Sequence, residues 1–166
     1  MSTTFRKHLR GMAIVSALFL LIALAVLGAA ISKVFSMATI GQSYDADGAR
    51  AYQAARAGVE WVAYQVLKGS CSGGDFCALC RSASYGTPTT RTLSGLSGDL
   101  SAFTVTVSCG SGGSSYSEGG AAVWVYNITA NACNQPGAGA ACPNTTQAAV
   151  ASLGYAERQI SLTISN

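Results

Sequence analysis

The cysteines are the residues of this sequence whose side chains carry the most distinctive chemistry. Cys77 and Cys80 form a C-x-x-C motif, which occurs in dithiol redox sites and supplies half of some zinc sites. The sequence holds no second C-x-x-C motif, and no βαβ pattern surrounds this one, so structural disulfides are favoured. The candidates for disulfide formation are Cys71, Cys77, Cys80, Cys109, Cys133 and Cys142.

All of these cysteines follow an apolar run near the N-terminus, on the side of it where we expect an oxidising compartment. Sequence alone does not choose among the many pairings that such a set allows. We expect Cys133 to close a loop with Cys142, and the other four to join the 71–80 loop to itself and to Cys109. Each bridge typically stabilises a small domain by about 2–4 kcal/mol.

Few other side chains are arranged for catalysis or metal binding. The single histidine is His8, and no convergent nucleophile, base or metal cluster accompanies it. Asp45 and Asp47 resemble the start of a calcium loop, but Arg56 occupies the position of the last acidic ligand of an EF-hand. We therefore expect no enzyme activity, no metal and no cofactor.

Three aromatic side chains, Trp61, Tyr64 and Trp124, could form a platform that binds a sugar. The alternative is that these rings pack a helix against a sheet, because large rings account for much of the buried area of a small domain. We favour the packing interpretation.

The apolar run extends from Met12 to Ile31 without a charged residue. As a helix, a run of this length covers roughly 30 Å, the thickness of the hydrocarbon core of a bilayer. Arg6, Lys7 and Arg10 precede it, and positive charge before a first span holds the N-terminus in the cytoplasm. An ordinary signal anchor fits this pattern, and so does a cleaved signal peptide with a small-residue site at 27–30.

The junction between the basic residues and the apolar run resembles that of type IV prepilins and pseudopilins. In that family a prepilin peptidase cuts after a glycine and methylates the new N-terminus. The resemblance places the cut between Gly11 and Met12. Without the leader the chain keeps seven basic and seven acidic residues, so the mature protein is formally neutral and nothing indicates a nucleic-acid-binding surface.

The fifth residue of the mature chain is Ser16, where the family usually has Glu. In a pilus that Glu neutralises the N-terminal ammonium of a neighbouring subunit inside an apolar bundle, where an unpaired charge is expensive. A subunit without the Glu is better tolerated at the filament tip. The resemblance implies that the face from Ile14 to Ile31 packs against other pilin helices. The residues expected to make these contacts are Ile14, Val15, Ser16, Leu18 and Phe19.

Residues 48–61 resemble the helix of the MshP family, minor pilin-like proteins of the mannose-sensitive haemagglutinin (MSHA) pilus system. The C-terminal strands and the segment from Cys133 to Cys142 extend this resemblance. It implies a role in pilus assembly and cell adhesion, with insertion in the bacterial inner membrane and a periplasmic C-terminal domain. The implied partners are other major and minor pilins, the prepilin peptidase, the inner-membrane assembly platform and the membrane, with no nucleic acid.

Hydrophobic periodicity indicates a helix between residues 47 and 68 with one buried face. Alternation predicts strands over 103–107, 121–130 and 159–164, whereas 70–98 and 110–120 read as loop and turn. In the middle strand, Val123, Val125 and Ile128 are expected on one face, and Trp124 and Tyr126 on the other. The expected helical stripe consists of Tyr52, Ala55, Val59, Val62, Ala63, Val66 and Leu67.

The predicted fold class is α+β, with a long N-terminal helix that is transmembrane and then amphipathic, packed on a small antiparallel sheet as in type IV pilins. The expected parts are a leader (1–11), a transmembrane helix (12–33), the periplasmic half of the helix (34–69) and a disulfide-stapled β domain (70–166). The pilin resemblance favours a melted or bent helix around Gly41 and Gly48.

Two other functions remain open from the sequence. One is a pseudopilin of a type II secretion machine, with the same processing and a different assembly. The other is a membrane-anchored, disulfide-rich adhesin domain that keeps its N-terminus and binds surface glycans.

Overall fold

The computed structural model describes the backbone of residues 5–69 and 71–166, and the side chains of residues 13–39, 41–69 and 71–166. The chain divides into two compact units, one ending at Ser43 and one extending from Tyr44 to Asn166. Helix α1, Phe5–Lys68, contributes residues to both units. The sheet, the disulfides and the remaining helices all belong to the second unit.

Two more α-helices, two short 3-10 helices and six strands make up the rest of the described structure. The helices are α2 (Phe76–Ser82), η1 (Gly98–Leu100), η2 (Ala138–Ala140) and α3 (Gln147–Val150). The strands are β1 (Thr89–Leu93), β2 (Thr104–Gly110), β3 (Tyr116–Glu118), β4 (Ala121–Val123), β5 (Val125–Cys133) and β6 (Glu157–Ser165).

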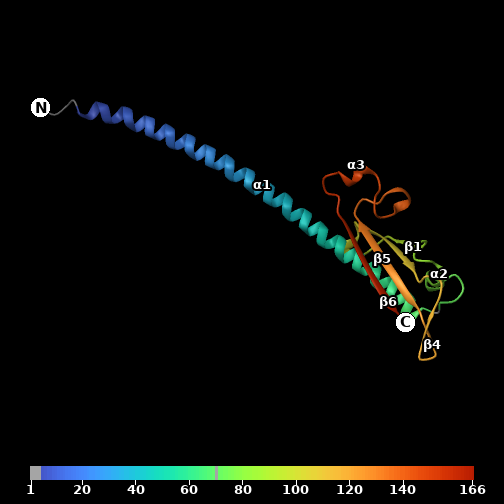
Figure 1. Ribbon diagram of the computed structural model, residues 1–166. Helices are drawn as coiled ribbons and strands as arrows, with labels where there is room; N and C mark the ends of the chain where they lie inside the picture. Colours follow the sequence, from blue (N-terminus) through green and yellow to red (C-terminus); the bar gives the residue numbers. More distant parts are fainter. Residues whose placement is uncertain (1–4, 70) are drawn as a thin grey trace. The chain divides into compact units, whose positions relative to one another are not determined.

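The main sheet has four antiparallel strands in the order β1-β2-β5-β6 (Figure 1). Its register places Val107 opposite Ala130 and Ile128 opposite Leu162, so apolar side chains line one face. The expected α+β class, with a long N-terminal helix and a small antiparallel sheet, is confirmed at this level.

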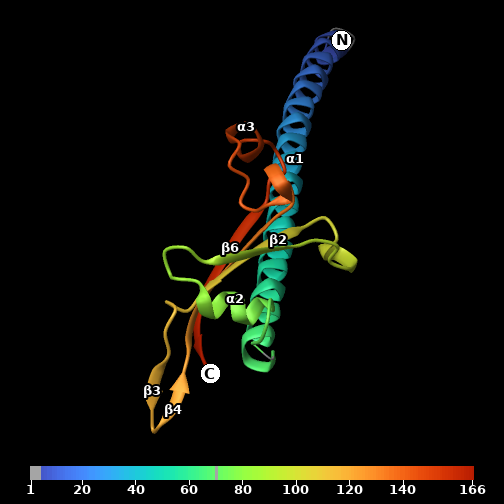
Figure 2. The same cartoon turned by 90° about the vertical axis from the view of Figure 1, so that its right-hand side faces the viewer.

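A separate hairpin of β3 and β4 extends beyond the main sheet (Figure 2). Gly119 and Gly120 form its two-residue turn, with φ values of 60° and 86°. Positive φ at both positions is what a type I′ hairpin turn requires, and only glycine adopts it without steric cost. The sequence interpretation of 110–120 as a turn missed this hairpin.

The core of the second unit lies between α1 and the sheet. Val62 and Val66 of α1 are fully buried, as are Val105, Val107 and Tyr126 of the sheet. Gly58 marks the closest approach, because a Cβ built there would lie 2.6 Å from Val105 Cγ1. A larger residue would therefore separate the helix from the sheet.

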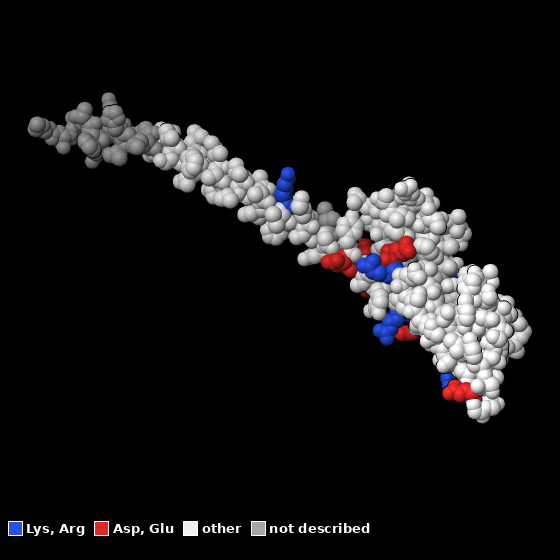
Figure 3. Space-filling model, in the orientation of Figure 1, with Lys and Arg blue, Asp and Glu red and all other residues white. Residues whose placement is uncertain are grey.

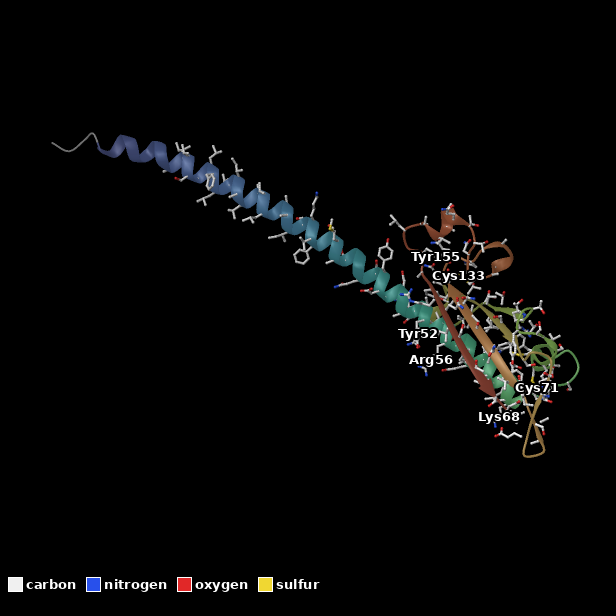
Figure 4. The ribbon with its side chains drawn as sticks, viewed as in Figure 1. Tyr52, Arg56, Lys68, Cys71, Cys133 and Tyr155 are labelled. Carbon is white, nitrogen blue, oxygen red and sulfur yellow. A yellow bond between two sulfur atoms is a disulfide. The ribbon has the colours of Figure 1, made fainter. Side chains whose placement is uncertain are left out.

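The predicted helical stripe is wrong at its two ends. Tyr52 and Leu67 are 49% and 48% exposed, and Tyr52 points away from the sheet (Figure 4). Ala51 and Ala54 are fully buried in its place. A helix that approaches a sheet this closely favours small side chains, and periodicity alone gave too much weight to large apolar residues.

The expected melting of α1 around Gly41 and Gly48 does not occur, because the backbone remains helical at both, and at Gly48 the missing side chain leaves room for the guanidinium of Arg158. Two further expectations are wrong. The segment 70–98 is not all loop, because it contains α2 and β1. Tyr126 shares the buried face with Ile128, because residues two apart in one strand point to the same face, and Val125 lies on the other.

Candidate functional site

The first candidate surface is the apolar part of α1 in the first unit, residues 13–39. Its large side chains are exposed, with values of 66% for Ile14, 70% for Val15, 55% for Leu18 and 71% for Phe19. Between residues 13 and 43 the only charged side chain is Lys33, so this surface is almost uniformly uncharged (Figure 3). An apolar surface of this size marks a site that lipid or another protein covers.

Three hydroxyl groups in this segment bond to the helix itself. Ser32 donates to the carbonyl oxygen of Gly28 at 2.9 Å, Ser36 to that of Ser32 at 3.0 Å, and Thr39 to that of Phe35 at 2.9 Å. Hydroxyl groups paired in this way need no water, so they are compatible with an apolar environment.

By length and composition, this part of α1 could cross a membrane, with a mean hydropathy of 2.9 over its most apolar window. The expected peptidase residues, Gly11 and Met12, fall within the bounds of α1, but their side chains lie outside the described residues. Ser16 lies on the exposed surface, next to the apolar residues expected to contact other helices.

The second candidate region is the set of disulfides in the second unit. Three bonds join Cys71 to Cys77, Cys80 to Cys109, and Cys133 to Cys142. Cys77 and Cys80 have different partners, so the C-x-x-C motif is not a dithiol pair. The expected bridge between residues 133 and 142 is present, and one bond lies within 71–80 while another reaches residue 109.

Two of the disulfides anchor α2: the Cys71–Cys77 bond joins it to the residues that follow α1, and the Cys80–Cys109 bond joins it to β2. Phe76 at the start of α2 is buried and its ring lies 5.1 Å from that of Trp61. Arg81 at the other end donates from Nε to the hydroxyl of Tyr126 at 2.9 Å. Figure 4 places Cys71 beside the end of α1 at Lys68, and Cys133 at the opposite end of the sheet.

The aromatic residues do not present a common open platform. Arg91 lies over the ring of Trp61 at 5.5 Å, and Arg81 lies over that of Trp124 at 5.0 Å. These contacts cover ring faces that a sugar would need for stacking. Both tryptophans pack against the core, as we expected, whereas Tyr64 is 65% exposed and does not.

The long connection from β5 to β6 is organised by amide side chains as well as by the disulfide of Cys133. Asn134 accepts from the backbone N–H of Ala156 at 3.0 Å, and Asn144 donates to the carbonyl oxygen of Gln135 at 2.9 Å. The connection contacts the sheet where the backbone N–H of Cys142 donates to Thr106 Oγ1 at 2.8 Å.

Tyr155 in this connection donates a hydrogen bond to Glu157 and accepts one from the backbone N–H of Asn144 at 3.3 Å. Burial raises the pKa of the Tyr155 hydroxyl above its ordinary value, and the hydrogen bond to Glu157 acts in the same direction.

A shallow groove of about 340 Å³ runs over the outer face of β5 and β6. Its polar side chains are paired with one another: Thr129 with Ser161 at 3.0 Å, and Thr163 with Asn127 at 2.8 Å. Among the described residues no group of three or more His, Cys, Asp or Glu side chains could hold a metal ion. The described residues thus present an exposed apolar helix surface and a shallow polar groove.

Comparisons with known proteins add no relative: no protein-family model, no curated protein and no solved structure matches this chain.

Proposed function

We propose that this protein is a minor pilin-like subunit of a type IV pilus of the MSHA type. A prepilin peptidase cuts it after Gly11 and methylates Met12. The mature subunit is held in the bacterial inner membrane by α1, with its second unit in the periplasm, and then enters the pilus. It acts by association with other major and minor pilins and the assembly platform, and not by catalysis.

The exposed apolar surface of residues 13–39 is the observation that carries this proposal. Large side chains such as Phe19, Leu21 and Phe35 are 68–71% exposed, and each would gain about 1.5–3 kcal/mol on full burial. A membrane-inserted subunit buries them in lipid, and a pilus subunit buries them against neighbouring helices. The alternation between these two environments is what assembly of a pilin helix requires.

The disulfides of the second unit support the same proposal, because they indicate the compartment in which the unit lies. Three disulfides in a unit with a modest core suit an oxidising compartment outside the cytoplasm. The glycan-binding alternative gains no separate support, since the rings of Trp61 and Trp124 are covered by arginines. No observation favours the pseudopilin alternative over the pilus.

The test is whether the subunit is in the filament. Pili sheared from cells would be purified and probed with an antibody against the second unit, on blots and by immunogold electron microscopy. We expect labelled filaments in the parent strain and none in a Gly11→Leu strain, in which the peptidase site is lost. Equal amounts of subunit in the inner membrane of both strains, with none in parent pili, would contradict the proposal.

The position at the tip has its own test. The resemblance attributes tip placement to Ser16 in place of Glu, so Ser16→Glu should spread gold particles along the filament. Ser16→Ala is the matched control and should leave the label at the ends. An unchanged distribution in the Ser16→Glu strain would contradict tip placement without affecting membership of the pilus.

A further inference from the structure

The two edges of the main sheet differ in how well they are protected against pairing with another strand. Strand β1 has only five residues, follows Pro88, and carries Arg91. The guanidinium of Arg91 lies over Trp61, so this charge points toward the helix side of the sheet. Short length, a nearby proline and an inward charge are the devices by which natural proteins block an edge strand.

Strand β6, the other edge, has nine residues and none of these devices along most of its length. Its two charged residues, Glu157 and Arg158, lie at its start. The remainder, residues 159–165, reads Gln-Ile-Ser-Leu-Thr-Ile-Ser, without charge, proline or glycine. Such an edge is a ready template for a further strand.

The hydrogen-bond pattern shows which backbone groups point outward. Just beyond the strand, Trp124 and Asn166 exchange two backbone hydrogen bonds, each of 3.1 Å. In an antiparallel ladder such pairs recur every second residue, so Ile164, Leu162 and Ile160 also bond to β5. The N–H and C=O groups of the intervening residues therefore face away from β5. These residues are Gln159, Ser161, Thr163 and Ser165.

No backbone hydrogen bond to these outward groups occurs within the described chain. The side chains alternate as the backbone does. Ile160, Leu162 and Ile164 pack against the edge of the core and are only partly buried, while Ser161 and Thr163 face the outer side. An added strand would bury the three apolar side chains further. It would also place new partners beside the hydroxyl groups of Ser161 and Thr163.

We propose that the β6 edge binds an extended segment of another protein, which adds as a fifth strand to the main sheet. The segment must be uncharged where it lies beside 159–165. It must also alternate, with apolar side chains on the side of Ile160 and Ile164 and small polar side chains on the other. The inference concerns β6 alone and does not depend on peptidase processing or on pilus membership.

The experiment measures amide hydrogen exchange by NMR on the full chain in detergent micelles. The probe is a short synthetic peptide of alternating threonine and isoleucine with a lysine at each end. We expect it to slow exchange at the amides of Ser161 and Thr163 by about tenfold or more. The amide of Leu162 is already bonded to β5 and should change little. A peptide of the same composition without alternation is the control.

Two variants separate backbone pairing from other contacts. Thr163→Pro removes an outward N–H, whereas Thr163→Val keeps it, and both lose the hydroxyl that donates to Asn127. Proline is tolerated at an edge position whose N–H faces solvent. We expect the peptide to bind the valine variant and not the proline variant, while protection of Leu162 persists in both and reports an intact β6.

Three results would overturn the inference. The first is unchanged exchange at Ser161 and Thr163 under a large excess of peptide. The second is equal slowing at Ser161 in the Thr163→Pro variant. The third is protection of these amides that rises with protein concentration in the absence of peptide, because a second copy of the chain would then occupy the edge.

Discussion

Two stretches of the same helix, residues 13–39 and residues 51–66 of α1, are both apolar and differ in what covers them. In the first, Leu18 and Phe19 are 55% and 71% exposed, and in the second, Val62 and Val66 are 0% and 1% exposed. The second stretch uses small residues and a glycine, which let the sheet approach closely. The first carries large apolar side chains among its alanines, such as Leu18, Phe19 and Leu21, and the described residues of its own unit offer them no partner surface.

The comparison shows that helical apolar sequence alone does not identify a core. A face of alanine, valine and glycine fits a sheet of the same chain, because close contact needs small side chains. A helix that is apolar on all sides has no face to keep in water, so it needs an apolar environment all round. Residues 13–39 are thus covered by nothing in the described part of their own unit, whereas residues 51–66 pack against β2 and β5.

The largest expected effect comes from placing the same charge in each stretch. Val62→Arg buries an unpaired guanidinium, and we expect a loss of about 3–5 kcal/mol, enough to unfold the second unit. Leu21→Arg should change the unfolding free energy by less than about 0.5 kcal/mol, because Leu21 is 68% exposed. Denaturant unfolding of the full chain in micelles, followed by the fluorescence of Trp61 and Trp124, measures both.

In a membrane, the arginine at position 21 should have the large effect and the arginine at position 62 the small one. An arginine at the centre of a span costs about 2.5–3.5 kcal/mol, so Leu21→Arg should release the protein from membranes on alkaline extraction. An arginine at position 62 should leave extraction unchanged. If Leu21→Arg unfolded the second unit, or if both variants stayed in the membrane, the distinction between the two stretches would fail.

Removing a disulfide should destabilise only the second unit, in which residues 51–66 are packed. Replacing Cys80 and Cys109 by alanine opens a bridge with a sequence separation of 29, and we expect a loss of about 3–4 kcal/mol. Replacing Cys71 and Cys77 opens one with a separation of 6, with a loss of about 2–3 kcal/mol. The midpoints of denaturant unfolding show which double variant is less stable. Equal midpoints for the two variants would contradict the expected difference.

Adding a single methyl group should also affect the two stretches differently, with a smaller change in the free energy of unfolding. Gly58→Ala brings Cβ to 2.6 Å from Val105 Cγ1 and 3.1 Å from Val107 Cγ1, and overpacking of this kind costs about 1–3 kcal/mol. Gly28→Ala meets no atom within 4 Å and should be neutral or slightly stabilising. Both are measured by denaturant unfolding, and stabilisation by Gly58→Ala would show that the helix does not approach the sheet closely.

The smallest expected effect concerns alkaline pH. The pKa of Tyr155 is raised in the folded chain, so its contribution is complete below the ordinary tyrosine pKa of about 10 and is lost as pH rises through the folded value. We expect stability to fall above about pH 10, and less steeply in Tyr155→Phe. Unfolding midpoints at a series of pH values measure the slopes. Identical slopes would show that this hydroxyl does not contribute.

Much of the fold could be predicted because its signals are periodic and local. The strand pattern of 159–164 alternates without interruption and became β6, and the helical spacing of Val59, Val62 and Val66 identified the buried face of α1. Six cysteines on one side of an apolar run indicated a disulfide framework, and the bridge from Cys133 to Cys142 is present.

The rest depended on contacts between distant segments. Helix α2 has only seven residues, and it is held by bonds from Cys77 and Cys80 and by the Trp61 contact, none of which has a local signal. Strand β1 forms against β2, and although its threonines favour a strand, it has no alternation of apolar and polar residues that would have marked it. The β3–β4 hairpin carried a signal in its Gly-Gly turn that a search for paired glycines could have found.

The measurement that most directly tests the central claim is N-terminal mass spectrometry of the native protein from cells with and without the prepilin peptidase. We expect a terminus at methylated Met12 in the first strain and the full leader in the second. An intact N-terminus at Met1 or Ser2 in both strains would contradict processing and favour a permanent anchor. A terminus near Ile31 in both would mean that residues 13–31 are discarded as a signal peptide, and that their exposed apolar surface plays no part in assembly.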